Sequence, residues 1–251
     1  MAGNSARPRV SVASRVLDVL AAFDDEHRSL TLSDLARRAG QPLTTTYRLV
    51  GELVRWGALI RRESGEYVVG RRMWDLGLLA PVETDLRHAA SPFLQDLYGA
   101  TLATVHLAVR DGTSVLYVER VSGHASVPVV SQVGSRLPMH ATGVGKVLLA
   151  YAPENVRAEV LANLTRITPY TVTQPGRLLE QIRRAHGAGY ATTSEEMSLG
   201  ACSVAVPVRD RAGAEVVAAL GIVVASLRRD RDRLVSALQV AARGIGRSLP
   251  P

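Results

Sequence analysis

The segment from His140 to Lys146, HATGVGK, is the first part of this 251-residue chain whose pattern suggests a chemistry, the binding of a phosphate. A phosphate-binding loop needs glycine at its first position and serine or threonine directly after its lysine. This segment begins with His140, and Val147 follows Lys146. The pattern therefore argues against a nucleotide site.

Other side chains that could serve catalysis or metal binding are also poorly spaced. Glu195 and Glu196 are adjacent, and neighbouring residues of an extended segment point to opposite faces, so a paired-carboxylate site with His140 is not expected. Neither Cys202 nor Ser203 has a nearby base that would make it a nucleophile. The six histidines lack zinc-site spacings, and a single cysteine excludes a cysteine-rich site. We expect no enzyme activity, no metal and no cofactor.

The composition is that of an ordinary folded protein, with 47% apolar and 21% charged residues. No apolar run approaches the ~20 residues that span a bilayer, and polar residues interrupt the apolar stretches near the start of the chain. We therefore expect neither a membrane segment nor a signal peptide, and we expect a cytoplasmic location. The net charge of +7 permits a nucleic-acid partner without requiring one.

The first third of the chain has the pattern of a helix-turn-helix. Apolar residues recur at helical spacing over 12–23. A second helix is expected to begin after Thr31, at a capping box, and to end at Gly40. After a short turn, a third helix capped by Thr44 is expected to run to about Trp56. Two short helices joined by a tight turn are typical of this motif.

The residues that follow predict a wing and a connecting helix. Strands over 58–62 and 66–69 flank a turn at 63–65, which is the hairpin expected of a winged helix. A helical pattern continues after Gly70. We therefore divide the chain into a flexible arm (1–10), a winged helix-turn-helix domain (11–70), a linker helix (71–84) and a second domain (85–251).

The pattern of the second domain predicts an antiparallel sheet with helices, so the fold class is α+β. Strand-like segments at 103–110 and 114–121 flank Asp111-Gly112, a strong hairpin signal. A third strand is expected near 127–133, and a second hairpin joins 202–209 to 215–224. Helices are expected over 142–152, 154–162, 176–186 and 231–247.

Two segments of this domain carry a family resemblance: RLPMHATGVGKVLLA at 136–150 and GYATTSEEMSLGACSVAVPV at 189–208. Together with the winged helix before them, they resemble the IclR-type bacterial transcriptional regulators over about residues 11–248. The resemblance implies a GAF-like C-terminal domain that binds a small-molecule effector. It also implies a homodimer or a dimer of dimers on a palindromic double-stranded DNA operator. Of the two directions of regulation, we favour repression.

The third helix and the wing supply the expected DNA contacts, because the first residues of a recognition helix face base edges in the major groove. Arg48 can donate two hydrogen bonds to guanine, and the methyl group of Thr45 can contact thymine. On the helical pattern Thr46 faces inward, and Tyr47 fits the core as well. The predicted DNA-binding residues are Thr44, Thr45, Thr46, Tyr47 and Arg48 on the helix, and Arg61 and Arg62 on the wing, where phosphates are the expected partners.

The resemblance also implies an effector pocket. In relatives, backbone amides at the positions of Gly143 and Val144 meet the carboxylate of the ligand, which suits the free N–H groups of a helix start. We expect Thr193 and Ser203 to orient a polar group at the far end of the ligand. The predicted pocket residues are Leu137, Met139, Gly143, Val144, Thr193, Ala201, Ser203, Gly221 and Val223.

This chain departs from the family pattern at four of these positions. Thr193 and Ser203 stand where aspartate and cysteine are common, and Gly221 and Val223 stand where some relatives have serines. The lost hydrogen-bonding groups favour a larger or more apolar carboxylic acid, such as an aromatic one, over glyoxylate or pyruvate. Gly221 and Val223 also fit plain strand packing.

Two other functions remain open at this point. One is a metabolite-binding enzyme or sensor domain tethered to DNA, for which turnover of the metabolite would be the evidence. The other is a scaffold whose winged helix binds protein, for which DNA binding that weakens steeply with salt would be absent. No residue pattern supports either function.

Overall fold

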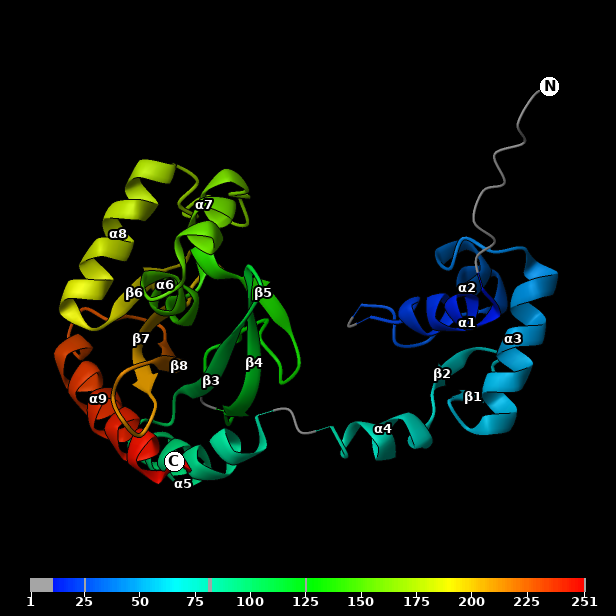
Figure 1. Cartoon of the computed structure of the whole chain (residues 1–251), viewed down its shortest axis with the longest axis horizontal. Helices are drawn as coiled ribbons and strands as arrows, with labels where there is room; N and C mark the ends of the chain where they lie inside the picture. Colours follow the sequence, from blue (N-terminus) through cyan, green and yellow to red (C-terminus); the bar gives the residue numbers. More distant parts are fainter. Residues whose placement is uncertain (1–10, 25, 81–82, 125, 251) are drawn as a thin grey trace. The chain divides into compact units, whose positions relative to one another are not determined.

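The computed structural model describes residues 11–24, 26–80, 83–124 and 126–250. The arm expected at 1–10 lies outside the described residues. The chain divides into two compact units, residues 1–81 and 82–251. The first is mainly helical, and the second contains a sheet with helices on both of its faces (Figure 1).

The first unit contains the helix-turn-helix, built from α1 (Val12–Ala21), α2 (Leu32–Arg38) and α3 (Leu43–Trp56). The Oγ1 atom of Thr31 accepts a hydrogen bond from the Asp34 amide, which confirms the predicted start of α2. Gly40 has a φ of +62°, the left-handed backbone expected just after a helix. Helix α3 has Pro42 at its N-cap position and no side-chain cap, so the predicted capping role of Thr44 is wrong.

One face of α3 forms much of the core of this unit. Leu49, Val50 and Leu53 recur at spacings of one, three and four residues and are buried against α1 and α2. This pattern leaves the opposite face of the helix, which carries Arg48 and Arg55, in solvent.

The predicted wing is confirmed as β1 (Leu59–Arg61) paired antiparallel with β2 (Tyr67–Val69). Tyr67 also bridges to Leu30, which ties the wing to the segment before α2. Helix α4 (Arg71–Gly77) follows β2. The linker helix predicted over 71–84 is too long, because α4 ends at Gly77 and the next helix begins at Thr84 in the second unit.

The second unit is built on a six-stranded antiparallel sheet with the order β5-β4-β3-β8-β7-β6. Its strands are β3 (Thr104–Asp111), β4 (Ser114–Val121), β5 (Arg136–Pro138), β6 (Ala191–Ser194), β7 (Cys202–Arg209) and β8 (Val216–Val224). Both predicted hairpins, β3–β4 and β7–β8, are confirmed, and the pairing of β3 with β8 joins them into one sheet.

Helices cover both faces of this sheet. On one face pack α5 (Thr84–Thr101) and α9 (Arg231–Ser248), which share a buried cluster with the sheet. On the other face lie α6 (Gly143–Ala150), α7 (Glu154–Ala162) and α8 (Pro175–Ala188), with a second cluster. Figure 1 shows α5 next to α9, and α6 between the sheet and α8. The predicted α+β class is confirmed.

The strand predicted near 127–133 is wrong. This stretch is irregular, and Pro128 within it has no N–H group for a ladder hydrogen bond. The edge strand is instead β5, which leads directly into a single 3-10 turn at Met139–Ala141. Helix α5 and strand β6 were not predicted from the sequence. Helix α5 carries Pro92 in its interior, which interrupts a helical pattern, and β6 is only the four-residue segment ATTS.

Candidate functional site

The start of α3 presents most of the predicted DNA-binding side chains to solvent. Tyr47 is 65% exposed, Thr44 and Arg48 are exposed, and Thr45 is half-buried. Thr46 is fully buried, and its hydroxyl donates to a backbone carbonyl one turn earlier at 3.1 Å. Thr46 therefore belongs to the core of the first unit, and its prediction as a DNA contact is wrong.

The wing adds two further exposed cations, Arg61 and Arg62. The guanidinium carbon of Arg61 lies 5.9 Å from the ring centroid of Tyr67, so an aromatic ring supports its side chain. Within the described part of the chain, no carboxylate forms an ion pair with Arg48, Arg61 or Arg62. Their charges are therefore available to an external anion.

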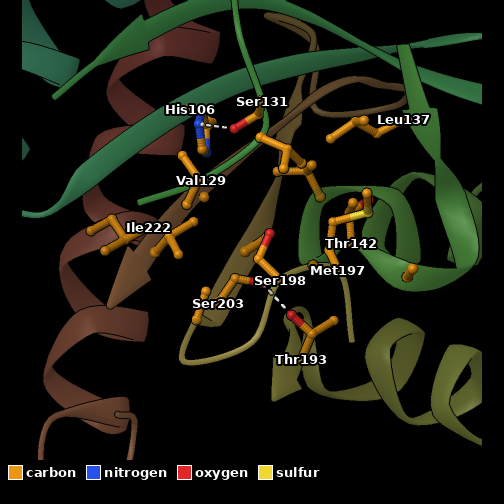
Figure 2. Close-up of a pocket in the computed structure, with 18 of the residues that line it drawn as sticks. His106, Val129, Ser131, Leu137, Thr142, Thr193, Met197, Ser198, Ser203 and Ile222 are labelled. Carbon is orange, nitrogen blue, oxygen red and sulfur yellow. Dashed lines mark hydrogen bonds between the residues drawn. The ribbon is translucent and has the colours of Figure 1, made fainter. Parts of the chain in front are cut away.

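A cavity in the second unit, ≈ 490 Å³ with its open mouth included, lies between the start of α6, the sheet and the loop after β6. Figure 2 shows residues that line it. All of the predicted pocket residues except Met139 line it. The other lining residues are His106, Tyr117, Val129, Val130, Ser131, Ala141, Thr142, Met197, Ser198, Val204, Ala205 and Ile222.

Met139 packs elsewhere. Its side chain is fully buried in the apolar cluster beneath α6 and α8. The 3-10 turn that begins at Met139 turns this side chain into the core, whereas Leu137 on β5 lines the cavity. The prediction of Met139 as a pocket residue is therefore wrong.

The first turn of α6 forms one wall of the cavity. The Oγ1 atom of Thr142 accepts a hydrogen bond from the Gly145 amide at 3.1 Å, which caps the helix. Within the described residues, the amides of Gly143 and Val144 donate no hydrogen bond. Because a helix N-terminus carries partial positive charge, these two N–H groups can receive a carboxylate.

Thr193 and Ser203 lie next to these amides. Their hydroxyl oxygens are 2.6 Å apart across the β6–β7 ladder. A Cβ atom added to Gly143 would lie 2.5 Å from the Ser203 Oγ atom, so Ser203 touches the first residue of α6. The pair therefore belongs to the same end of the cavity as the amides, and the predicted place at the far end is wrong.

Gly221 lets α6 approach the sheet. A Cβ atom at this position would lie 2.9 Å from Val144 Cγ1 and 3.3 Å from Ala205 Cβ. The residue thus serves strand packing and cavity shape together, because it sets how closely the α6 amides approach the sheet. Val223 lies between Ser203 and Thr104 in the ladder and adds apolar wall.

The cavity holds a second polar pair that was not predicted from the sequence, His106 and Ser131, each 3% exposed. His106 Nε2 lies 2.8 Å from Ser131 Oγ, as Figure 2 shows. Burial lowers the pKa of His106 to about 3, and the charge of Arg120 adds to this, so the ring is neutral at neutral pH. The sequence pattern did not indicate this pair, because Ser131 lies in the irregular stretch that was predicted to be a strand.

Tyr117 completes this part of the wall. Its ring meets the His106 ring edge-on with centroids 5.0 Å apart. A β-bulge between Leu107 and Ala108 shifts the β3–β4 register, which places Tyr117 opposite Ala108. Burial raises the pKa of Tyr117, although a hydrogen bond with Thr142 opposes this, so the phenol is neutral too. Among the described lining residues there is no Asp, Glu, Lys or Arg.

Both units match one family. Residues 12–63 match the IclR helix-turn-helix domain, and residues 80–247 match the domain described as bacterial transcriptional regulator IclR C-terminal. The chain belongs to the IclR family of bacterial transcriptional regulators. The resemblance seen in the two sequence segments is thereby confirmed.

Relatives in the IclR family match over nearly the whole chain. An IclR homolog from Microbacterium hydrocarbonoxydans, solved in complex with 4-hydroxybenzoate, is 37% identical with a TM-score of 0.88, covering 95% of this chain and 99% of that one. The transcriptional regulator XynR of Escherichia coli (strain K12) is 31% identical, over 96% of this chain and 98% of its own. The transcriptional repressor AllR of the same strain is 30% identical, over 88% and 83%.

The side chains considered for catalysis have structural partners in this IclR-family chain. His140 donates to the Thr165 carbonyl at 2.8 Å, and Glu195 accepts from the Gly200 amide at 2.8 Å. Glu196 is paired with Lys146. Adjacent Glu195 and Glu196 thus have different partners, but the extended segment expected here is wrong, because the chain bends after β6 and Glu195 has a φ of +56°. The Cys202 thiol is half-buried and lies 3.5 Å from the Ser194 hydroxyl.

The described residues contain no group of three or more His, Cys, Asp or Glu side chains that could hold a metal ion. They also contain no helix that is both long enough and apolar enough to cross a membrane.

Proposed function

We propose that this protein is a repressor whose affinity for a palindromic DNA operator is lowered by an aromatic carboxylic acid. The observation that carries the proposal is the cavity of the second unit, with two free helix amides at one end and an otherwise uncharged lining. Such a lining favours an effector with one negative charge, because a second buried charge would have no partner.

The carboxylate would accept hydrogen bonds from the amides of Gly143 and Val144. The body of the acid would pack against Leu137, Ala201 and Val223, which line the same cavity. Each buried CH₂ group contributes ~0.8 kcal/mol, so an apolar wall of this size favours a ring over an acid of two or three carbons. The solved relative in complex with 4-hydroxybenzoate supports this choice.

The DNA would be read by the exposed start of α3. Arg48 would donate to a base edge, and Thr44, Thr45 and Tyr47 would contact bases or phosphates beside it. The wing residues Arg61 and Arg62 would contact phosphates. The exposure of these side chains supports the proposal, since all but the half-buried Thr45 are open to solvent.

A homodimer, or a dimer of dimers, would place two recognition helices on the two half-sites of a palindrome. Exposed apolar side chains on α1 and α4 support this. Leu17 is 63% exposed on α1, Trp74 is 61% exposed on α4, and Leu78 directly after α4 is 63% exposed. Light scattering should therefore give a dimer or a tetramer, and a monomer of 26.9 kDa at micromolar concentration would contradict the proposal.

We also propose that the protein acts without turnover or a cofactor, in the cytoplasm where its DNA target lies. The partners of His140, Glu195 and Glu196 support this, because each is already held in a structural contact. A metabolite-binding enzyme tethered to DNA would instead convert the acid, which chromatography of the acid after incubation would reveal.

The central experiment follows DNA release. Genomic fragments selected by the purified protein serve as the operator, and fluorescence anisotropy measures their affinity with benzoate, 4-hydroxybenzoate, pyruvate or glyoxylate added. We expect an aromatic acid to release the DNA. Release by pyruvate or glyoxylate, with none by either aromatic acid, would refute the aromatic effector and leave the family assignment intact.

A further inference from the structure

The cavity has two hydrogen-bonded polar pairs, and they lie at opposite ends. Figure 2 shows Thr193 with Ser203 at one end and His106 with Ser131 at the other. Ser203 is on β7 and His106 is on β3, and β8 runs between these strands. Two strand spacings, ~10 Å in all, therefore separate the two pairs.

The pair Thr193–Ser203 lies at the end of the cavity where the carboxylate is proposed to bind, called here the acid end. Ser203 contacts Gly143, whose amide is free to receive the carboxylate in the proposed function. An effector that reaches from these amides across the cavity must meet the second pair at its other end. The surface between the ends is largely apolar, with Val223 and Val129 among its residues.

The second pair is rigidly held. Ser131 is in hydrogen-bond contact with His106 through its hydroxyl, and its carbonyl accepts from Arg120 Nη1 at 2.9 Å. His106 and Arg120 are direct partners in the β3–β4 ladder, so the sheet itself positions both contacts. The ring of Tyr117 packs against the ring of His106. An uncharged, fixed pair of this kind is suited to recognising a polar group of the ligand rather than to packing alone.

The chemistry of the pair limits what it can recognise. A neutral imidazole and a hydroxyl between them can both donate and accept a hydrogen bond. A ligand hydroxyl needs both roles and brings no charge. An ammonium group would be buried without a counter-ion, since the described lining residues carry no charged side chain, and the Arg120 guanidinium behind Ser131 would repel it.

We infer that the effector carries a hydroxyl group at the end opposite its carboxylate, and that His106 and Ser131 select for this hydroxyl. The inference rests on the proposed function, in which the carboxylate occupies the α6 amides. Across a six-membered ring, the position opposite the carboxylate is the para position. The protein should therefore prefer 4-hydroxybenzoate to benzoate and to 2-hydroxybenzoate, whose hydroxyl would lie at the acid end.

Isothermal titration calorimetry of the full chain with these three acids tests the inference. A site that hydrogen-bonds a ligand hydroxyl disfavours the analogue that lacks it, and we expect roughly a tenfold preference of the wild-type protein for 4-hydroxybenzoate over benzoate. Ser131→Ala and His106→Phe should each reduce that ratio to about twofold or less. Ser131 lies outside regular structure, so its variant provides the test if His106→Phe fails to fold.

Thr193→Val is the matched control, because it removes a hydroxyl from the acid end. It should change the affinities for both acids in the same direction and keep the ratio. The inference is overturned if the ratio survives Ser131→Ala, or if Thr193→Val abolishes it. If wild-type protein binds benzoate as tightly as 4-hydroxybenzoate, this inference alone fails. If it binds no aromatic acid but binds pyruvate or glyoxylate, the proposed effector class fails and the inference with it.

Discussion

The Nζ atom of Lys146 on α6 lies 2.6 Å from Oε1 of Glu196, which follows β6 and precedes β7. Both side chains are buried, at 1% and 7% exposed. Burial lowers the pKa of Lys146, and the carboxylate of Glu196 opposes that shift. Glu196 directly precedes Met197, which lines the cavity. The ion pair thus fixes a loop on one side of the cavity to the helix whose amides form another side.

Backbone contacts hold the same loop. The hydroxyl of Thr168 donates to the Glu195 carbonyl at 2.6 Å, and that of Thr171 donates to the Glu196 carbonyl at 2.7 Å. The loop is therefore anchored by the segment before α8 as well as by α6. The single lysine of the chain has a structural role here, which fits its failure to match a phosphate-binding loop.

Lys146→Met should destabilise the second unit strongly. The variant leaves Glu196 buried without its cation, and removing one partner of a buried pair costs about 3–5 kcal/mol. Scanning calorimetry of the full chain should show a lower transition temperature for the second unit. Arg184→Met is the control, because the Arg184–Glu180 pair is 67% and 68% exposed and contributes about 0–1 kcal/mol. Equal effects of the two substitutions would contradict the prediction.

The hydrophobic pattern predicted the parts of the fold in which each element has its own local signal. The α2 cap at Thr31, the wing and the hairpin at Asp111-Gly112 were found because a few neighbouring residues determine them. Strand β6 and the irregular stretch 127–133 were not predicted correctly. The conformation of β6 depends on its pairing with β7, and that of 127–133 depends on its packing in the cavity wall.

The residues of the candidate site also divide into those with a local signal in the sequence and those that only the folded chain brings together. Gly143 and Val144 could be placed through the resemblance, because a helix start can be seen in the sequence. His106 and Ser131 could not, because they are 25 positions apart and only the folded sheet brings them together. Met139 was misplaced because the 3-10 turn reverses the direction expected from a loop.

The stability of the second unit should fall in acid, with His106 as one cause. Its pKa is about 3 in the folded protein against 6.5 in the unfolded chain, so between these values the unfolded chain binds the extra proton. The stabilising contribution of the neutral ring is complete above pH 6.5. It is lost as the pH falls towards 3, by up to about 1.4 kcal/mol per pH unit.

Urea unfolding at pH 7, 5 and 4 measures this dependence. His106→Phe should have a shallower decline than the wild-type protein, since Phe takes up no proton. His88→Gln, an exposed position on α5, should keep the wild-type decline. If His106→Phe and the wild-type protein decline in parallel, the buried neutral state assigned to His106 is wrong.

Arg48 and Arg61 should affect DNA binding in different ways. Arg48→Ala should weaken binding to the selected operator by roughly 1–3 kcal/mol, with little effect on unrelated DNA, if Arg48 contacts a base. Arg61→Ala should weaken binding to the selected operator and to unrelated DNA alike. It should also reduce the slope of log affinity against log salt by about 0.9, the value for one phosphate. Anisotropy titrations at several salt concentrations measure both quantities. Arg177→Ala, at an exposed position on α8, is the control and should bind DNA as the wild-type protein does. Wild-type affinity in all three variants would mean that α3 and the wing do not form the DNA-binding surface.

Gly143→Ala should block the acid end of the cavity. The added methyl group would lie 2.5 Å from Ser203 Oγ, so Ser203 must move and the new carbon occupies space beside the free amides. We expect at least about a tenfold loss of affinity for an aromatic acid, measured by calorimetry, and a lower melting temperature.

The double variant Gly143→Ala/Ser203→Ala removes the clashing oxygen and leaves ordinary contacts of 3.4 and 3.6 Å, so its melting temperature should recover while acid binding stays weak. Gly99→Ala, where an added Cβ meets nothing within 4 Å, should bind the acid as the wild-type protein does. Wild-type affinity in Gly143→Ala would mean that the carboxylate does not lie at the start of α6.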